Sequence, residues 1–174
     1  ELGLRTLFNV LGPMANPAGL KQQLIGVYDR ALCRPVAQVL QRLGSEHVLV
    51  VHSEDGLDEI SLAADTHVAE LKGGVVSEYK LEPEQLGFER QGMQDLVVDG
   101  VEQSLQLITS ALAGEKDSRS QRAANMIALN AGAALYVAGV AASIADGVNT
   151  ANGILANGAG LEKLQQLAAM TRSF

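Results

Sequence analysis

The sequence predicts an α/β fold in which a central, mostly parallel sheet with a β-hairpin is flanked by helices. Two apolar runs typical of buried strands, residues 24–28 and 47–52, are separated by a helical pattern. Two alternating runs follow around a Lys-Gly-Gly turn, and the chain from residue 101 onward has helical periodicity. Because no linker interrupts the 174 residues, we expect residues 1–174 to form a single α/β domain.

The first half of the chain is expected to contain a βαβ unit. Between the apolar runs at residues 24–28 (LIGVY) and 47–52 (HVLVVH), hydrophobic residues recur at helical spacing over residues 29–43, and Gly44 is a plausible helix stop. A crossover of this length joins parallel strands and is nearly always right-handed. Ligands of open α/β sheets bind at the carboxyl ends of the strands, so the loop after the second strand is the expected site.

The second half is expected to contain a hairpin and then helices. Residues 66–71 and 75–80 alternate around the turn and predict the hairpin. Ser118 or Ser120 is a candidate N-cap for the second helix. Four helices are predicted, at residues 101–112, 118–137, 141–156 and 161–170. The glycines of residues 153–160 lie between helices, without a preceding strand, and so do not predict a phosphate-binding loop.

The composition bounds the possible partners and the compartment. The formal net charge of −7 argues against binding to nucleic acid or to an anionic membrane surface. Cys33 is the sole cysteine, which favours a reducing, cytoplasmic location. The most apolar stretch, residues 123–145, is interrupted by Asn125 and Asn130 and predicts a buried helix rather than a membrane span. Residues 1–10 contain neither a signal-peptide pattern nor an initiator Met, so we expect a fragment.

Asp58 and Glu59 are the strongest candidates for chemistry. They follow the strand at residues 47–52, in a loop rich in turn residues. One or two carboxylates, completed by substrate phosphates and water, are the usual protein ligands of Mg²⁺. The alternative is a solvated acidic turn, which the neighbouring Glu54 and Asp55 favour. From the residues alone the acidic turn is the commoner outcome.

Other polar residues are interpreted as structural. His47 and His52 are expected to form hydrogen bonds at the two ends of a strand, and His52, nearer the ligand edge, stays a weaker functional candidate. His67 begins the hairpin and is expected to be exposed. Asn130 lies on an apolar helix and must find partners, so we expect a satisfied core or capping residue. Small neighbours of Asn130 would let another helix or loop pack closely.

Residues 5–17 (RTLFNVLGPMANP) contain a proline-bounded loop. Pro13 and Pro17 exclude a regular helix there and make the loop rigid. Such a loop can offer an apolar wall to a flat aromatic substrate, but a simple connector is the interpretation that composition favours.

Three segments together resemble the anthranilate phosphoribosyltransferase family. They are residues 5–17, residues 56–61 (GLDEIS) and residues 129–136 (LNAGAALY), in the same order and spacing as in that family. The resemblance implies a Mg²⁺-dependent glycosyltransferase of tryptophan biosynthesis. Such an enzyme transfers the phosphoribosyl group of phosphoribosyl pyrophosphate to the amino group of anthranilate, and pyrophosphate leaves.

The resemblance also implies site residues. The pair Asp58 and Glu59 would hold magnesium, and Pro13 would line the anthranilate site. The family's pyrophosphate loop, its anthranilate-clasping arginine and its amino-terminal helical domain would precede Glu1, so Arg5 is interpreted as structural and no catalytic residue is assigned. We therefore expect a carboxy-terminal fragment, inactive alone, of an enzyme that is a homodimer when complete.

Two alternatives stay open. One is an enzyme like the pyrimidine nucleoside phosphorylases, which share the fold. The other is a non-catalytic relative of the same fold. Presence of the Asp58–Glu59 pair argues against both, and the acidic charge argues further against a DNA-associated relative. Ser53 stands where the family commonly has glycine, which is a mild departure.

Overall fold

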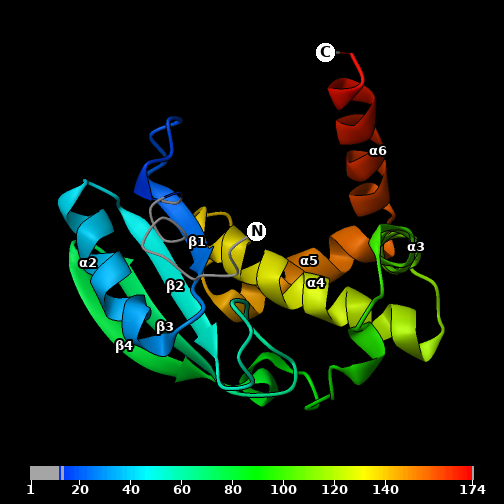
Figure 1. The fold of residues 1–174 in the computed structure, drawn as a ribbon, viewed down its shortest axis with the longest axis horizontal. Helices are drawn as coiled ribbons and strands as arrows, with labels where there is room; N and C mark the ends of the chain where they lie inside the picture. Colours follow the sequence, from blue (N-terminus) through cyan, green and yellow to red (C-terminus); the bar gives the residue numbers. More distant parts are fainter. Residues whose placement is uncertain (1–11, 13, 174) are drawn as a thin grey trace.

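The computed structural model describes residue 12 and residues 14–173, and its strands form one four-stranded sheet (Figure 1). In the order of the sheet, which is also the order of the sequence, the strands are β1 (Gln22–Gly26), β2 (His47–Ser53), β3 (Thr66–Lys72) and β4 (Val75–Leu81). The predicted strands and hairpin are confirmed, although β1 begins and ends two residues earlier than expected.

The sheet is mixed, and the expectation of a mostly parallel sheet was wrong for the described strands. β1 pairs with β2 in parallel, whereas β2 with β3 and β3 with β4 are antiparallel. The tight turn between β3 and β4 can join only antiparallel strands, and the loop of residues 54–65 returns the chain from β2 to β3 in the opposite direction. The parallel pair is therefore confined to the predicted βαβ unit.

The βαβ crossover covers one face of the sheet. A 3-10 turn, η1 (Arg30–Leu32), leads into α2 (Cys33–Arg42), and the Asp29 side chain accepts a hydrogen bond from the Ala31 N–H at 2.9 Å. Gly44 follows with φ +84°, the left-handed geometry expected of a helix stop. The buried residues of α2 that face the sheet are Cys33, Val36, Ala37 and Leu40.

Four helices follow the hairpin, after two short 3-10 turns, η2 (Pro83–Leu86) and η3 (Gln94–Leu96). The helices are α3 (Val101–Leu112), α4 (Ser118–Val137), α5 (Ile144–Ala156) and α6 (Ala159–Thr171). The predicted N-cap of α4 was wrong. Asp117 caps it, accepting from the N–H groups of Arg119 and Ser120, because both candidate serines already lie inside the helix.

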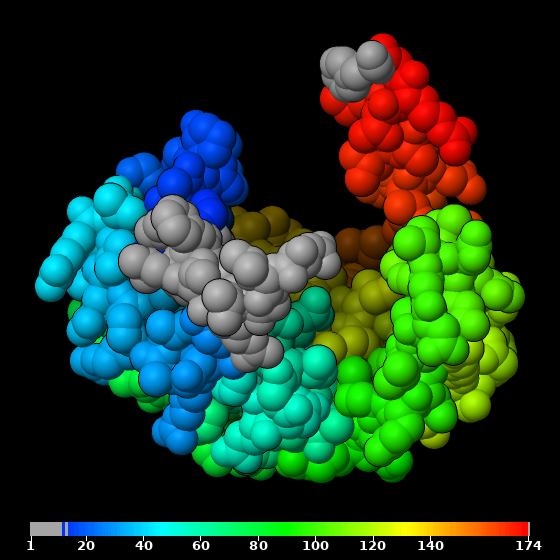
Figure 2. Space-filling view, viewed as in Figure 1, coloured from blue at the N-terminus to red at the C-terminus, as the bar shows by residue number. Residues whose placement is uncertain are grey.

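Helix α4 covers the second face of the sheet and packs against α5, whose Ile144 and Val148 belong to the same buried cluster. Sheet residues Leu49 and Val51 share a buried cluster with Leu129 and Ala133 of α4. Where α4 and α5 meet, Gly132 of α4 packs against Gly147 of α5, which confirms the expected close packing around Asn130. Figure 2 shows an open hollow between α6 and the loop before β1, with α4 and α5 behind it. No helix of the described residues is both long and apolar enough to span a bilayer.

Candidate metal and substrate site

The loop that joins β2 to β3, residues 54–65, is closed by backbone hydrogen bonds near the end of β2. The Ser53 N–H donates to the Leu57 carbonyl at 2.9 Å, and the Glu54 N–H donates to the Asp65 carbonyl at 2.9 Å. Gly56 turns the chain with φ +92°, a conformation that favours glycine. The turn places the following residues at the carboxyl end of β2, which is the expected ligand edge of the sheet.

Three of the five carboxylates in this loop have structural partners, and one of these, Asp65, forms an ion pair with Arg90 at 2.8 Å. Glu54 forms an ion pair with Lys80 at 2.5 Å. Asp55 accepts a hydrogen bond from the buried Ser61 hydroxyl at 2.6 Å and another from the Leu57 N–H at 3.3 Å. Burial alone would raise the pKa of Asp55, but these donors together hold it below its usual value. Asp55 therefore stabilises the loop itself, whereas Glu54 ties the loop to β4.

Asp58 and Glu59 differ from these three. Neither side chain has a hydrogen bond or ion pair with another described residue. Partial removal from water and then the charge of Asp58 raise the pKa of Glu59. Asp58 and Glu59 are thus adjacent carboxylates with no cationic partner among the described residues, an arrangement that a divalent cation can bind.

The donor set fits a hard cation that keeps other ligands. Within the described part of the chain, no three His, Cys, Asp or Glu residues gather into a complete metal cage. Zinc sites of proteins usually provide three or four such side chains, whereas Mg²⁺ commonly takes one or two carboxylates and fills its shell with phosphates and water. Asp58 and Glu59 therefore could supply part of the coordination shell of a Mg²⁺ ion.

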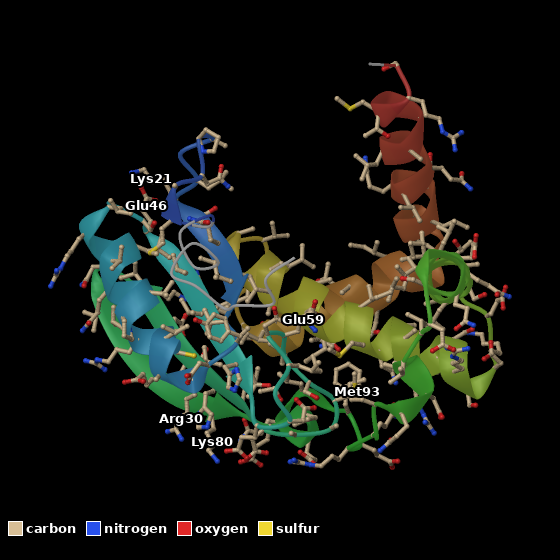
Figure 3. All side chains as sticks on the ribbon, in the orientation of Figure 1. Lys21, Arg30, Glu46, Glu59, Lys80 and Met93 are labelled. Atoms are coloured by element: carbon tan, nitrogen blue, oxygen red, sulfur yellow. The ribbon has the colours of Figure 1, made fainter. Side chains whose placement is uncertain are left out.

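Two residues that sequence analysis did not connect with the pair hold its backbone. At Gly26, the last residue of β1, an added Cβ would lie 1.6 Å from the Asp58 carbonyl oxygen, so the loop rests directly on the strand end. On the other side, Asn130 of α4 bonds to both the N–H and the carbonyl of Ile60. Figure 3 shows Glu59 beside α4, in the middle of the molecule. A glycine within the apolar run of residues 24–28 was the only sequence signal for the contact at Gly26.

The histidines are structural in the described part of the chain. His47 bonds to Glu70 at 2.9 Å, and His52 Nδ1 lies 2.8 Å from the Val27 carbonyl oxygen. His67 is only 8% exposed, so its predicted exposure was wrong. It lies on β3, an inner strand, and its ring contacts Glu54 at 3.3 Å.

Not every predicted site residue can be placed. Pro13 and Arg5 lie outside the described residues, as do most of residues 5–17. The structure therefore brings together Asp58 and Glu59 with Gly26 and Asn130, and the proposed apolar wall at Pro13 stays a prediction.

Glu59→Gln is expected to stabilise the protein in the absence of metal. The folded-state pKa of Glu59 is raised, so its charged form destabilises the native state at neutral pH. Below the ordinary pKa of 4.5 the carboxyl is protonated in both states and the penalty vanishes. Denaturant unfolding in EDTA should give the variant a higher unfolding free energy than the parent at pH 7. This difference should shrink as the pH falls through the folded-state pKa of Glu59. A gap that widens toward acid pH contradicts the assignment.

The fold and the site define a class of protein: an α/β domain with two adjacent carboxylates, unpartnered among the described residues, at the carboxyl end of a parallel strand. Residues 1–161 match the family described as "Glycosyl transferase family, a/b domain". The chain belongs to this family.

Relatives of known name support the same grouping. The chain is 59% identical over all of its 174 residues to the anthranilate phosphoribosyltransferase of Ectopseudomonas mendocina, and 58% identical to that of Pseudomonas entomophila. It spans 50% of the length of each of these relatives. A crystal structure of the Thermus thermophilus enzyme superposes with a TM-score of 0.85 at 36% identity, covering 98% of this chain and 49% of that one.

Proposed function

We propose that the protein to which this chain belongs is an anthranilate phosphoribosyltransferase of tryptophan biosynthesis, dependent on Mg²⁺. The observation that carries the proposal is the unpaired Asp58–Glu59 pair at the ligand edge of a glycosyl transferase α/β domain. The named relatives support it over the full length of the chain. A yeast anthranilate phosphoribosyltransferase with a similar fold, TM-score 0.82 at 24% identity, has been solved in complex with PRPP and Mg.

The chemistry explains why such an enzyme needs carboxylates here. Anthranilate's amino nitrogen forms a bond to C1 of the ribose while the bond from C1 to pyrophosphate breaks, so negative charge grows on the leaving group. Asp58 and Glu59 would hold Mg²⁺, which neutralises that charge when bound. Because the pair supplies two side chains, coordination positions remain for phosphate oxygens and water.

Further assignments accompany this proposal. Pro13 would line the anthranilate site, residues 1–174 would form one domain, and the complete enzyme would be a cytoplasmic homodimer. Anthranilate and phosphoribosyl pyrophosphate are the proposed substrates.

The test is the loss of anthranilate fluorescence on adding phosphoribosyl pyrophosphate and Mg²⁺ to the complete protein. Turnover is expected. No turnover, or turnover only of pyrimidine nucleosides with phosphate, rejects the proposal and supports one of the alternative relatives.

The double variant Asp58→Asn, Glu59→Gln tests the metal role separately. We expect the Mg²⁺ concentration for half-maximal activity to rise by at least about 10-fold, because loss of even indirect ligand support costs about that much. The matched control makes the same two chemical changes at exposed positions. These are Asp99→Asn, just before α3, and Glu102→Gln, in the first turn of α3. An unchanged Mg²⁺ dependence in the site variant rejects the metal role.

A further inference from the structure

Asn130 uses both ends of its side-chain amide on one residue of the loop. Its Oδ1 accepts from the Ile60 N–H at 3.0 Å, and its Nδ2 donates to the Ile60 carbonyl at 2.9 Å and to the Met126 carbonyl at 3.2 Å. Two opposed bonds to the same residue fix its orientation as well as its position. Hydrogen bonds in a partly buried setting are also electrostatically stronger than those in water.

The bonded residue directly follows the carboxylate pair. The Ile60 N–H belongs to the peptide that joins Glu59 to Ile60, while the carbonyl of Asp58 rests against Gly26. The backbone of residues 58–60 is therefore held from α4 on one side and from β1 on the other. Ile60 is itself 1% exposed, so its side chain adds an apolar anchor below the loop.

Helix α4 is a firm base for such a contact. Six residues beyond Asn130, the Tyr136 hydroxyl donates to Glu70 of β3 at 2.7 Å and lies 3.0 Å from the Lys72 ammonium that donates to it. Glu70 is buried and also contacts His47 of β2. These contacts tie α4 to the sheet independently of the loop, so Asn130 cannot easily follow the loop if the loop moves.

We propose that Asn130 is a positioning residue that presets the Asp58–Glu59 pair for Mg²⁺ by holding the Ile60 peptide. This inference rests on the proposed metal role of the pair. Adjacent carboxylates repel each other, and an unheld loop would have to be ordered when the ion binds. Groups that orient metal ligands in advance remove that cost from binding.

The test variant is Asn130→Leu in the complete protein, since leucine has a similar shape but no hydrogen-bonding atoms. Asn125→Leu is the matched control: Asn125 lies on the same helix, and its side chain accepts from Gln121 at 3.3 Å with no bond to the loop. Hydrogen–deuterium exchange without metal should become faster over residues 57–62 in Asn130→Leu alone. Calorimetric titration with MgCl₂ and phosphoribosyl pyrophosphate should show Mg²⁺ affinity about 10-fold weaker in that variant.

Each result decides the inference. Unchanged exchange over residues 57–62, or unchanged Mg²⁺ affinity, overturns the positioning role. If Asn130→Leu fails to fold, Asn130→Ala, which favours the helix, is measured in the same way. If Asp58→Asn with Glu59→Gln leaves Mg²⁺ binding intact, the proposed metal role fails. If that double variant weakens binding and the Asn130 variants do not, the positioning role alone is rejected.

Discussion

Gly26→Ala is expected to destabilise the protein by about 1–3 kcal/mol or more and to displace the Asp58–Glu59 pair. The added Cβ would lie 1.6 Å from the Asp58 carbonyl oxygen and 2.6 Å from its carbonyl carbon. Both atoms belong to the backbone, so no side-chain rotation relieves the contact. Because β1 is held along its length by β2, the loop is the part expected to move.

The measurement combines denaturant unfolding of the complete protein with Mg²⁺ titration. We expect lower unfolding free energy and weaker Mg²⁺ binding together. Gly100→Ala is the control: nothing lies within 4 Å of its added Cβ, and its φ of 167° is extended backbone that alanine adopts. If the unfolding free energy of Gly26→Ala lies within about 0.5 kcal/mol of the parent, the range of ordinary surface changes, the steric argument is contradicted.

Among the glycines of the helical half, Gly147 is the one at which alanine is expected to destabilise the protein most. Its added Cβ would lie 2.1 Å from the carbonyl oxygen of Gly132, so α5 would have to move away from α4. Helix propensity alone favours alanine over glycine by about 1 kcal/mol. Overpacking against a backbone atom costs about 1–3 kcal/mol or more, so the steric cost should exceed the gain in helix propensity and the variant should be less stable.

A second glycine of the same helix separates the two effects. At Gly153 nothing lies within 4 Å of an added Cβ, and the residue is exposed within α5. Gly153→Ala should therefore raise the unfolding free energy by about 0.5–1 kcal/mol while Gly147→Ala lowers it. Unfolding curves of the two variants measured side by side give the signs. Equal effects at both positions would show that α4 and α5 do not pack as closely as the structure indicates.

Local sequence rules predicted most elements because periodicity and turn chemistry act over a few residues. The helices at 101–112 and 118–137 have the expected bounds, and β2 differs from its expected range by one residue. Where such rules failed, a distant contact intervened. His67 begins a hairpin strand, which suggested exposure, but neighbouring strands on both sides bury it. The parallel character of the sheet was overestimated because two of the three strand pairings, β2 with β3 and β3 with β4, are antiparallel.

The Asp58–Glu59 pair separates what adjacent residues determine from what tertiary packing determines. The sequence by itself determined that Asp58 and Glu59 follow a buried strand in a turn-rich loop, because that depends on adjacent residues. Only the tertiary structure decided that Glu54 has an ion-pair partner and Asp55 has hydrogen-bond donors, while Asp58 and Glu59 have neither among the described residues. It also decided that the pair is held by Gly26 and by Asn130, which contacts the loop across 70 residues of chain. Hydrogen bonds and steric contacts between distant segments depend on packing geometry, which no local pattern encodes.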